Sequence, residues 1–229
     1  MQKQKIAAIV LAGGSGTRMG SACKKQYLSL NGRPVLFYAL QAFQESLVDE
    51  IILVTNEPDY CREAILQKYG LNKVSKLVAG GERRQDSVYA GLLAAKGCAY
   101  VLIHDGARPF LTQDIIETSV AAAEQYAACA VGVPAKDTIK LEDGRGFAER
   151  TLPRERIWQI QTPQTFSYPL ILEAYRKIQT ERAVQITDDA MAVEYAQNQK
   201  VRLIMGSYDN IKLTTPEDMA VAEAFLKNK

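Results

Sequence analysis

The chain has few of the residues that common catalytic and metal centres require. It has a single histidine, His104, so a histidine-based metal centre or a Ser-His-Asp triad is a poor explanation for any activity. Its cysteines have no C-x-x-C spacing, which argues against a zinc site or a disulfide framework and favours reduced thiols in a cytoplasmic protein. The cysteines are Cys23, Cys61, Cys98 and Cys129.

The chain also lacks a strong net charge and long apolar runs. A formal net charge of +2 is too small to indicate a nucleic-acid or membrane partner, so any basic patch must be local. No stretch approaches the roughly 20 apolar residues of a membrane span. The apolar run after Lys3 and Lys5 ends at a glycine-rich loop, too early for a signal peptide. A hydrophobic content of 47% and a charged content of 24% are typical of soluble globular proteins.

Short apolar runs alternate with helical patterns along the chain. The expected strands are Ile6–Leu11, Ile51–Thr55, Lys76–Val78, Tyr100–His104, Ala128–Val133 and Val201–Met205. The expected helices are Pro34–Gln44, Asp59–Tyr69, Gln85–Lys96, Thr112–Tyr126, Pro169–Gln179, Thr187–Gln197 and Pro216–Lys227. Their expected N-caps include Thr112, Thr187 and Thr215. The alternation predicts one α/β domain over residues 1–229, with a mostly parallel sheet and helices on both faces.

Residues 136–158 interrupt this alternation. Asp143-Gly144 lies between two alternating segments, which is a hairpin signal. A two-stranded hairpin is marginally stable alone. We therefore expect an arm that projects from the domain and packs on the same arm of a second subunit, forming a homodimer. The alternative is a hairpin that lies on its own domain.

A glycine-rich loop directly follows the first expected strand. It contains Gly13 and Gly14, and then the cations Arg18 and Lys25. Glycines let the backbone approach a ligand and point N–H groups at it, and cations neutralise a polyphosphate. The loop is not a P-loop, and it misses the G-x-G-x-x-G pattern because its last glycine, Gly20, falls one place late. The stretch predicts a nucleoside triphosphate site, and a tight βα connection with surface cations is the alternative.

Polar clusters follow several other expected strands. Ligands of open α/β sheets bind beyond the carboxyl ends of the strands, where both the glycine loop and Asp105 are expected. Asp105 is well placed to hold Mg²⁺, and Arg108 could hold a phosphate bidentately, with a local ion pair between the two as the alternative. Gly80, Gly81 and Ser87 could approach a base or ribose, unless they merely begin a helix with a charged first turn.

The run from Leu11 to Gly20, with Lys25-Gln26-Tyr27 after it, resembles the signature of sugar nucleotidyltransferases. Further motifs make the chain similar to the 2-C-methyl-D-erythritol 4-phosphate cytidylyltransferase family, from Ile6 to about Phe225. These motifs are Gly80-Gly81, Asp86-Ser87-Val88, His104-Asp105-Gly106-Ala107-Arg108-Pro109, Asp137-Thr138, Gln161-Thr162-Pro163-Gln164, Ile186-Thr187-Asp188 and Asp209-Asn210-Ile211-Lys212. The resemblance implies a Rossmann-like nucleotidyltransferase fold of the glycosyltransferase-A-like type.

The resemblance also implies a reaction, the transfer of CMP from CTP to 2-C-methyl-D-erythritol 4-phosphate, a small polyol phosphate. The transfer depends on Mg²⁺ or another divalent cation, releases pyrophosphate and belongs to the non-mevalonate isoprenoid pathway. A phosphate oxygen is already a competent nucleophile, so catalysis reduces to alignment and neutralisation of charge. The alternatives are a ribitol 5-phosphate cytidylyltransferase and a non-catalytic nucleotide-binding regulator of the same fold.

Roles for individual residues are implied in the same way. The catalytic residues would be Arg18, Lys25, Asp105 and Lys212. The CTP-binding residues would be Ala12, Gly13, Gly14, Gly80, Gly81, Glu82 and Ser87. The substrate-binding residues would be Arg108, Thr138, Arg154, Thr162, Thr187 and Asp209, with Arg154 reaching across from the partner's arm. The metal ligands would be Asp105 and Asp209. Lys24 stands where the family often has proline, and we assign the phosphate-facing role to Lys25 because it directly precedes Gln26.

Overall fold

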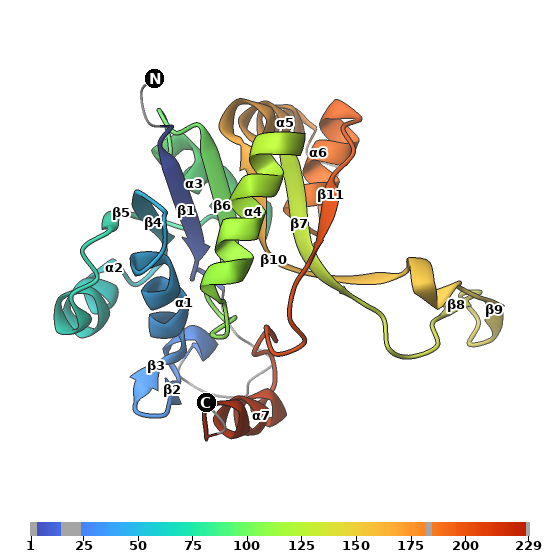
Figure 1. Ribbon diagram of the computed structural model, residues 1–229, viewed down its shortest axis with the longest axis horizontal. Helices are drawn as coiled ribbons and strands as arrows, with labels where there is room; N and C mark the ends of the chain where they lie inside the picture. Colours follow the sequence, from blue (N-terminus) through green and yellow to red (C-terminus); the bar gives the residue numbers. More distant parts are fainter. Residues whose placement is uncertain (1–3, 15–23, 182–184, 228–229) are drawn as a thin grey trace.

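The computed structural model describes residues 4–14, 24–181 and 185–227, and its centre is a seven-stranded sheet. The strands are β1 (Ile6–Leu11), β4 (Glu50–Val54), β5 (Val74–Val78), β6 (Tyr100–Asp105), β7 (Ala128–Pro134), β10 (Trp158–Ser167) and β11 (Arg202–Met205). Their order is β11-β7-β10-β6-β1-β4-β5, and β10 alone runs antiparallel to its neighbours (Figure 1). The predicted mostly parallel α/β fold is therefore confirmed.

Two apolar cores cover the two faces of the sheet, because successive side chains of a strand point to opposite sides. In β1, Ala8 and Val10 belong to one core, and Ala7 and Ile9 belong to the other. The first core is closed by α1 (Val35–Gln44) and α4 (Gln113–Tyr126), which lie in front of the sheet in Figure 1. The second core is closed by α3 (Arg84–Ala94), α5 (Tyr168–Thr180) and α6 (Asp189–Gln197).

The helices follow the predicted ranges closely, but one predicted cap is wrong. Thr112 does cap α4, since its hydroxyl accepts a hydrogen bond from the Ile115 backbone N–H at 3.4 Å. Helix α6 begins later than predicted, and its N-cap is Asp188 rather than Thr187. The Asp188 carboxylate accepts from the Met191 backbone N–H at 2.8 Å, and its charge complements the positive end of the helix dipole. The predicted helix over residues 59–69 is α2 (Pro58–Tyr60), which continues as a π-helical turn over Cys61–Gln67.

The sequence pattern does not predict β10, the strand that separates β6 from β7. Its residues are mostly polar and Pro163 lies in their middle, both of which argue against an internal strand. A register shift between Ile160 and Gln164 accommodates the proline. The pattern also misses the short hairpin of β2 (Ser29–Leu30) and β3 (Arg33–Pro34).

The β2–β3 hairpin has a recognisable turn. Asn31 and Gly32 both have positive φ angles, of 49° and 77°, as an Asn-Gly hairpin turn requires. The hairpin shares a small third core with the last helix, α7 (Pro216–Lys227), around Leu30, Leu213 and Ala222.

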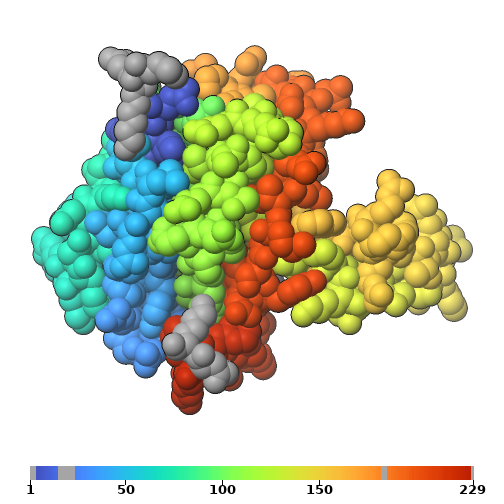
Figure 2. Space-filling model, in the orientation of Figure 1, coloured from blue at the N-terminus to red at the C-terminus, as the bar shows by residue number. Residues whose placement is uncertain are grey.

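The predicted hairpin within residues 136–158 forms from β8 (Lys140–Glu142) and β9 (Ala148–Thr151), which pair antiparallel. Figure 2 shows this arm standing clear of the rest of the molecule, joined to it near β7 and β10. Every residue of both strands is exposed, and Phe147 between them is 72% exposed. A second subunit as the partner of this surface stays a prediction.

Candidate functional site

A cavity of about 500 Å³ opens beyond the carboxyl ends of β1 and β6, where the parallel sheet is expected to bind its ligand. The predicted residues that line it from the N-terminal part of the chain are Ala12, Gly13, Gly14 and Lys25. Those from later in the chain are Gly81, Glu82, Ser87, Asp105 and Lys212. Gly80 adjoins this group, since a Cβ atom on Gly13 would lie 3.7 Å from its Cα.

The buried side chain of Gln26 fixes the start of the glycine-rich loop. Its Nε2 donates to the carbonyl oxygens of Ala12 at 2.6 Å and Gly14 at 3.1 Å. Lys25 and Gln26 belong to a short 3-10 helix, so the residue that holds the loop is adjacent to a cation in the cavity. Arg18, a predicted catalytic residue, lies outside the described residues.

Lys24 and Lys25 occupy different surroundings. The ammonium group of Lys24 lies 2.5 Å from Glu57 Oε1, at the rim beside the end of β4, whereas Lys25 lines the cavity. An exposed ion pair of this kind contributes at most about 1 kcal/mol. Lys24 therefore links the start of the short 3-10 helix to Glu57, while Lys25 faces the space that a ligand would fill.

The turn over residues 80–83 is held by the side chain of Asn56 and by side chains from the first turn of α3. Asn56 Oδ1 accepts from the Gly80 backbone N–H at 2.9 Å, and Ser87 Oγ accepts from the Gly81 N–H at 3.0 Å. A Cβ atom on Gly81 would overlap the side chain of Asp86, so this position requires glycine. Asp86 in turn pairs with Arg83, which lowers the pKa of that carboxyl to about 2.

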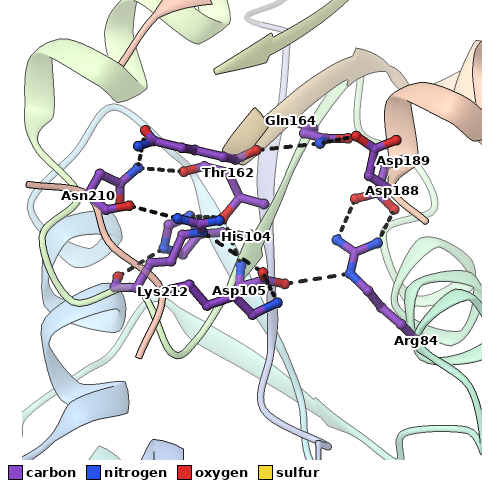
Figure 3. Close-up of polar contacts among 11 residues, drawn as sticks. Arg84, His104, Asp105, Thr162, Gln164, Asp188, Asp189, Asn210 and Lys212 are labelled. Atoms are coloured by element: carbon purple, nitrogen blue, oxygen red, sulfur yellow. Dashed lines mark hydrogen bonds and ion pairs between the residues drawn. The ribbon is translucent and has the colours of Figure 1, made fainter. Parts of the chain in front are cut away.

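Asp105 is the electrostatic centre of the site. Its carboxylate lies 2.7 Å from Lys212 Nζ, 3.6 Å from Arg84 Nε and 3.9 Å from Arg108 Nε (Figure 3). Burial alone would raise the pKa of Asp105, but Arg84, Lys212 and Arg108 together outweigh burial and hold the pKa well below its usual range. The group is therefore an ionised carboxylate at the wall of the cavity.

A chain of buried hydrogen bonds supports Asp105 from behind. The Asp105 backbone N–H donates to Thr162 Oγ1 at 3.1 Å, Thr162 Oγ1 lies 3.0 Å from His104 Nδ1, and His104 Nε2 lies 3.2 Å from the Arg108 carbonyl oxygen. The carbonyl can only accept, so the imidazole donates through Nε2 and accepts from the Thr162 hydroxyl through Nδ1. Burial lowers the pKa of His104 to about 4, which keeps the ring neutral at pH 7.

Arg108 and Asn210 join the Asp105 turn to the loop that holds Lys212. Arg108 Nη1 donates to the Asn210 carbonyl oxygen at 2.7 Å, and Asn210 Nδ2 donates to the Thr162 carbonyl oxygen at 2.9 Å. Both side chains are buried, and burial lowers the pKa of Arg108 although Asp105 opposes the shift. Sequence reasoning assigned Arg108 and Thr162 to the substrate; in this structure Arg108 Nη1 and Thr162 Oγ1 bond within the protein, whereas the buried Arg108 Nε has no hydrogen-bond partner among the described residues.

The other predicted substrate residues lie outside the cavity lining. Thr138 and Asp209 are exposed in loops, and Thr187 Oγ1 donates to Met191 Sδ at 3.4 Å. Arg154 is exposed at the base of the arm, where its Nη1 donates to the Lys136 carbonyl oxygen of its own chain at 2.8 Å. The structure of one chain thus gathers the predicted nucleotide side of the site but not the predicted acceptor side.

Six residues that line the cavity are absent from the predicted site: Leu11, Gln26, Asn56, Arg83, Arg84 and Ala107. Arg84 lies three residues after Gly81 and begins α3, and this position close to the predicted Gly80-Gly81 pair is the signal that could have found it. Within residues 4–14, 24–181 and 185–227, no three His, Cys, Asp or Glu side chains form a cluster able to hold a metal ion. Among the helices that are described, none is long and apolar enough to cross a membrane.

Comparison with known proteins decides the family. The model of the family described as "IspD: 2-C-methyl-D-erythritol 4-phosphate cytidylyltransferase" matches residues 6–228. The chain belongs to the IspD family. The IspD relative of Clostridium botulinum (strain Eklund 17B / Type B), which carries the same enzyme name, is 50% identical over 227 residues, covering 98% of this chain and 100% of that protein.

Solved IspD structures share the fold as well. The crystal structure of 4-diphosphocytidyl-2C-methyl-D-erythritol synthase from Anaerococcus prevotii DSM 20548 has a TM-score of 0.86 and 33% identity, covering 98% of this chain and 96% of that one. The cytidylyltransferase from Thermus thermophilus has a TM-score of 0.77 and 29% identity, covering 96% of this chain and 98% of that one. The predicted nucleotidyltransferase family is therefore confirmed, and the ribitol 5-phosphate alternative is not favoured.

Proposed function

We propose that this chain transfers CMP from CTP to 2-C-methyl-D-erythritol 4-phosphate and releases pyrophosphate; its IspD relatives are named 2-C-methyl-D-erythritol 4-phosphate cytidylyltransferases. The observation that carries the proposal is the wall of the cavity. An ionised Asp105 stands there among Lys212, Arg84 and Arg108, across the same cavity from Lys25 and the glycine loop.

These groups suit chemistry at a triphosphate. The acceptor phosphate is itself the nucleophile, so the protein has to align it with the α-phosphate and neutralise the charge that develops there. Lys25 and Lys212 supply that charge from opposite parts of the chain, and Arg18 joins them in the proposal. Ala12–Gly14 and Gly80–Glu82 would place backbone groups against the cytosine and ribose, with Ser87 holding the second loop in shape.

A divalent cation such as Mg²⁺ fits this donor set. Mg²⁺ is usually held through one or two carboxylates together with substrate phosphates, and Asp105 presents an ionised carboxylate at the cavity wall. Asp209 would be the second ligand, since it belongs to the loop that brings Lys212 within 2.7 Å of Asp105. When bound, the cation supplies charge neutralisation on the phosphates.

The acceptor would lie on the side of the cavity toward Thr138 and Thr187, with Arg154 completing the site from the arm of a second subunit. All three side chains are exposed. Arg108 and Thr162 would shape this side from beneath, because Arg108 Nη1 already bonds to Asn210 and Thr162 Oγ1 to Asp105 and His104. The homodimer is thus part of the proposed active site.

Pyrophosphate release tests the proposal directly. The enzyme is given CTP and Mg²⁺ with either 2-C-methyl-D-erythritol 4-phosphate or ribitol 5-phosphate, and Asp105→Asn serves as the inactive control. We expect release with the methylerythritol substrate and little with ribitol 5-phosphate. A higher kcat/KM for ribitol 5-phosphate would reassign the acceptor, and CTP binding without turnover of either acceptor would make the chain a non-catalytic regulator.

A further inference from the structure

Asp189, at the start of α6, is a fully buried carboxylate that the proposed reaction does not use. It accepts hydrogen bonds from Arg84 Nη1 at 2.9 Å and Arg84 Nη2 at 2.7 Å (Figure 3). It accepts a third from the Tyr175 hydroxyl. A buried ion pair is weak evidence for stability, because desolvation of the two charges offsets their attraction. Stability alone therefore does not explain why Asp189 is a buried carboxylate.

The same guanidinium reaches the active site with its other edge. Arg84 Nε lies 3.6 Å from Asp105 Oδ1, and the side chain is 28% exposed where it lines the cavity. Arg84 therefore stands between two carboxylates, one at the end of β6 and one at the start of α6, as Figure 3 shows. Its planar fork fixes the direction of both contacts, which a lysine at the same place would not do.

Further hydrogen bonds attach the segment around Asp189 to the same region. Gln164 donates to Asp188 Oδ2 at 3.1 Å and accepts from the Ala190 N–H at 2.7 Å. Gln85, next to Arg84 on α3, accepts from the Ile186 N–H at 3.4 Å. Residues 186–190 are thus fastened to Gln164 of β10 and to the first turn of α3, which begins directly after Arg83.

We propose that Arg84 and Asp189 are positioning residues that hold the acceptor-side segment, with Thr187, at a fixed distance from Asp105 and the nucleotide. The proposal rests on the proposed function, since it concerns the alignment of the two substrates. Arg84 is not assigned to a phosphate, because both Nη atoms bond to Asp189 and Nε faces Asp105. Misalignment of reacting groups by about 1 Å can cost roughly a hundredfold in rate, so loss of the Arg84–Asp189 contact should lower the rate strongly.

The test compares variants along this line of contacts. Asp189→Asn keeps the shape and removes the charge, Arg84→Lys keeps the charge and removes the fork, and Tyr175→Phe removes one hydrogen bond. Tyr168→Phe is the matched control, because Tyr168 also lies in α5 but its hydroxyl donates to the Leu92 carbonyl oxygen. For each, we measure kcat, KM for the acceptor, Kd for CTP with Mg²⁺ by calorimetry in the absence of acceptor, and Tm.

We expect Asp189→Asn and Arg84→Lys to lower kcat/KM for the acceptor by roughly ten- to a hundredfold, with a smaller loss for Tyr175→Phe. The Kd for CTP alone should stay within about twofold, and the double variant should be no worse than the poorer single variant, because the two residues act through one contact. Tyr168→Phe should match the wild type.

Other outcomes overturn the inference. A parallel loss of CTP affinity would make Arg84 a nucleotide ligand, and a lower Tm with unchanged kinetics would make the pair purely structural. Additive losses in the double variant would break the link between the two residues. If neither the wild type nor Tyr168→Phe turns over the acceptor, the proposed function fails. That outcome is distinct from failure of the inference, which is judged from the activities of the variants relative to an active wild type.

Discussion

The cavity wall around Asp105 and the arm formed by β8 and β9 differ in how far their side chains are buried and held by neighbours. Asp105 at the wall is 8% exposed and has three cations within 4 Å, at 2.7, 3.6 and 3.9 Å. The strands of the arm are exposed throughout, and Phe147 is 72% exposed. The geometry of the wall is therefore fixed within one chain, whereas the side chains of the two arm strands are exposed to solvent.

This difference separates the two halves of the proposed reaction. The groups assigned to CTP are gathered by the sheet, since β1 and β6 end side by side at Leu11 and Asp105. A Cβ atom at Gly106 would lie only 2.9 Å from the Leu11 carbonyl oxygen, so glycine is needed where the two ends meet. The groups assigned to the acceptor come from the surface. Damage to the wall should therefore stop chemistry, and damage to the arm should weaken acceptor binding.

The largest effect is expected at the wall, from Lys25→Ala. Lys25 would neutralise charge that grows in the transition state, and loss of one such contact typically costs about 10²–10³ in rate. Turnover should fall by that factor while the Kd for CTP changes much less. Lys24→Ala is the matched control, because its ion pair with Glu57 lies at the rim and contributes at most about 1 kcal/mol. A Lys25→Ala enzyme with normal kcat and a higher KM for CTP would reduce Lys25 to a binding role.

The second prediction concerns the buried side chain of His104 and the pH dependence that it gives to the stability of the fold. The pKa of His104 is about 4 in the folded protein and about 6.5 in the unfolded chain. Between these values the unfolded chain binds one more proton, so stability falls as the pH drops through this window. Lowering the pH from 7 to 4 should reduce the free energy of unfolding by about 3 kcal/mol through His104.

One measurement checks the pKa and another checks the stability. Because His104 is the only histidine, its imidazole NMR signals need no assignment, and they should stay those of the neutral ring down to about pH 4. Urea unfolding at pH 7 and pH 5 should show a smaller pH dependence for His104→Asn than for the wild type. Titration of the imidazole near pH 6.5 would show that the ring reaches solvent and is not locked behind Asp105.

The same comparison explains what the sequence could predict. Apolar runs mark the parallel strands, and Gly13 and Gly14 mark the end of β1, so the strand ranges and the place where β1 and β6 meet were predictable. The antiparallel β10 was not, because its polar residues and Pro163 are stabilised by neighbours distant in sequence. The same holds for the Arg84–Asp189 contact, which joins residues 105 positions apart. Local patterns do not report such pairings.

The partner of the arm is a further case. The surface of a single chain shows that the arm is exposed, but the residues that would cover it belong to another molecule. Asp143-Gly144 identified the hairpin because a tight turn is a local feature. A second subunit on this hairpin stays a prediction, because no local pattern in the sequence reports a contact between two chains.

The smallest effect of the three is expected for Arg154→Ala, which tests the arm. A phosphate monoester bound by an arginine gains charge-assisted hydrogen bonds, so acceptor binding should weaken by roughly 1.5–3 kcal/mol while CTP binding barely changes. Arg156→Ala is the matched control, since Arg156 is exposed in the same short 3-10 helix. Equal effects of the two substitutions would mean that only the local charge of the arm matters.

A mixed dimer decides whether Arg154 acts on its own site or on the partner's. One subunit carries Arg154→Ala and the other carries Lys25→Ala. If Arg154 serves the partner, one active site loses both residues and the other keeps both, so about half of the wild-type activity should remain. If Arg154 serves its own chain, as its present bond to the Lys136 carbonyl oxygen would allow, each site carries one lesion and activity should nearly vanish. A nearly inactive mixed dimer, or a monomer by sedimentation, would restrict the active site to the single chain that holds the cavity.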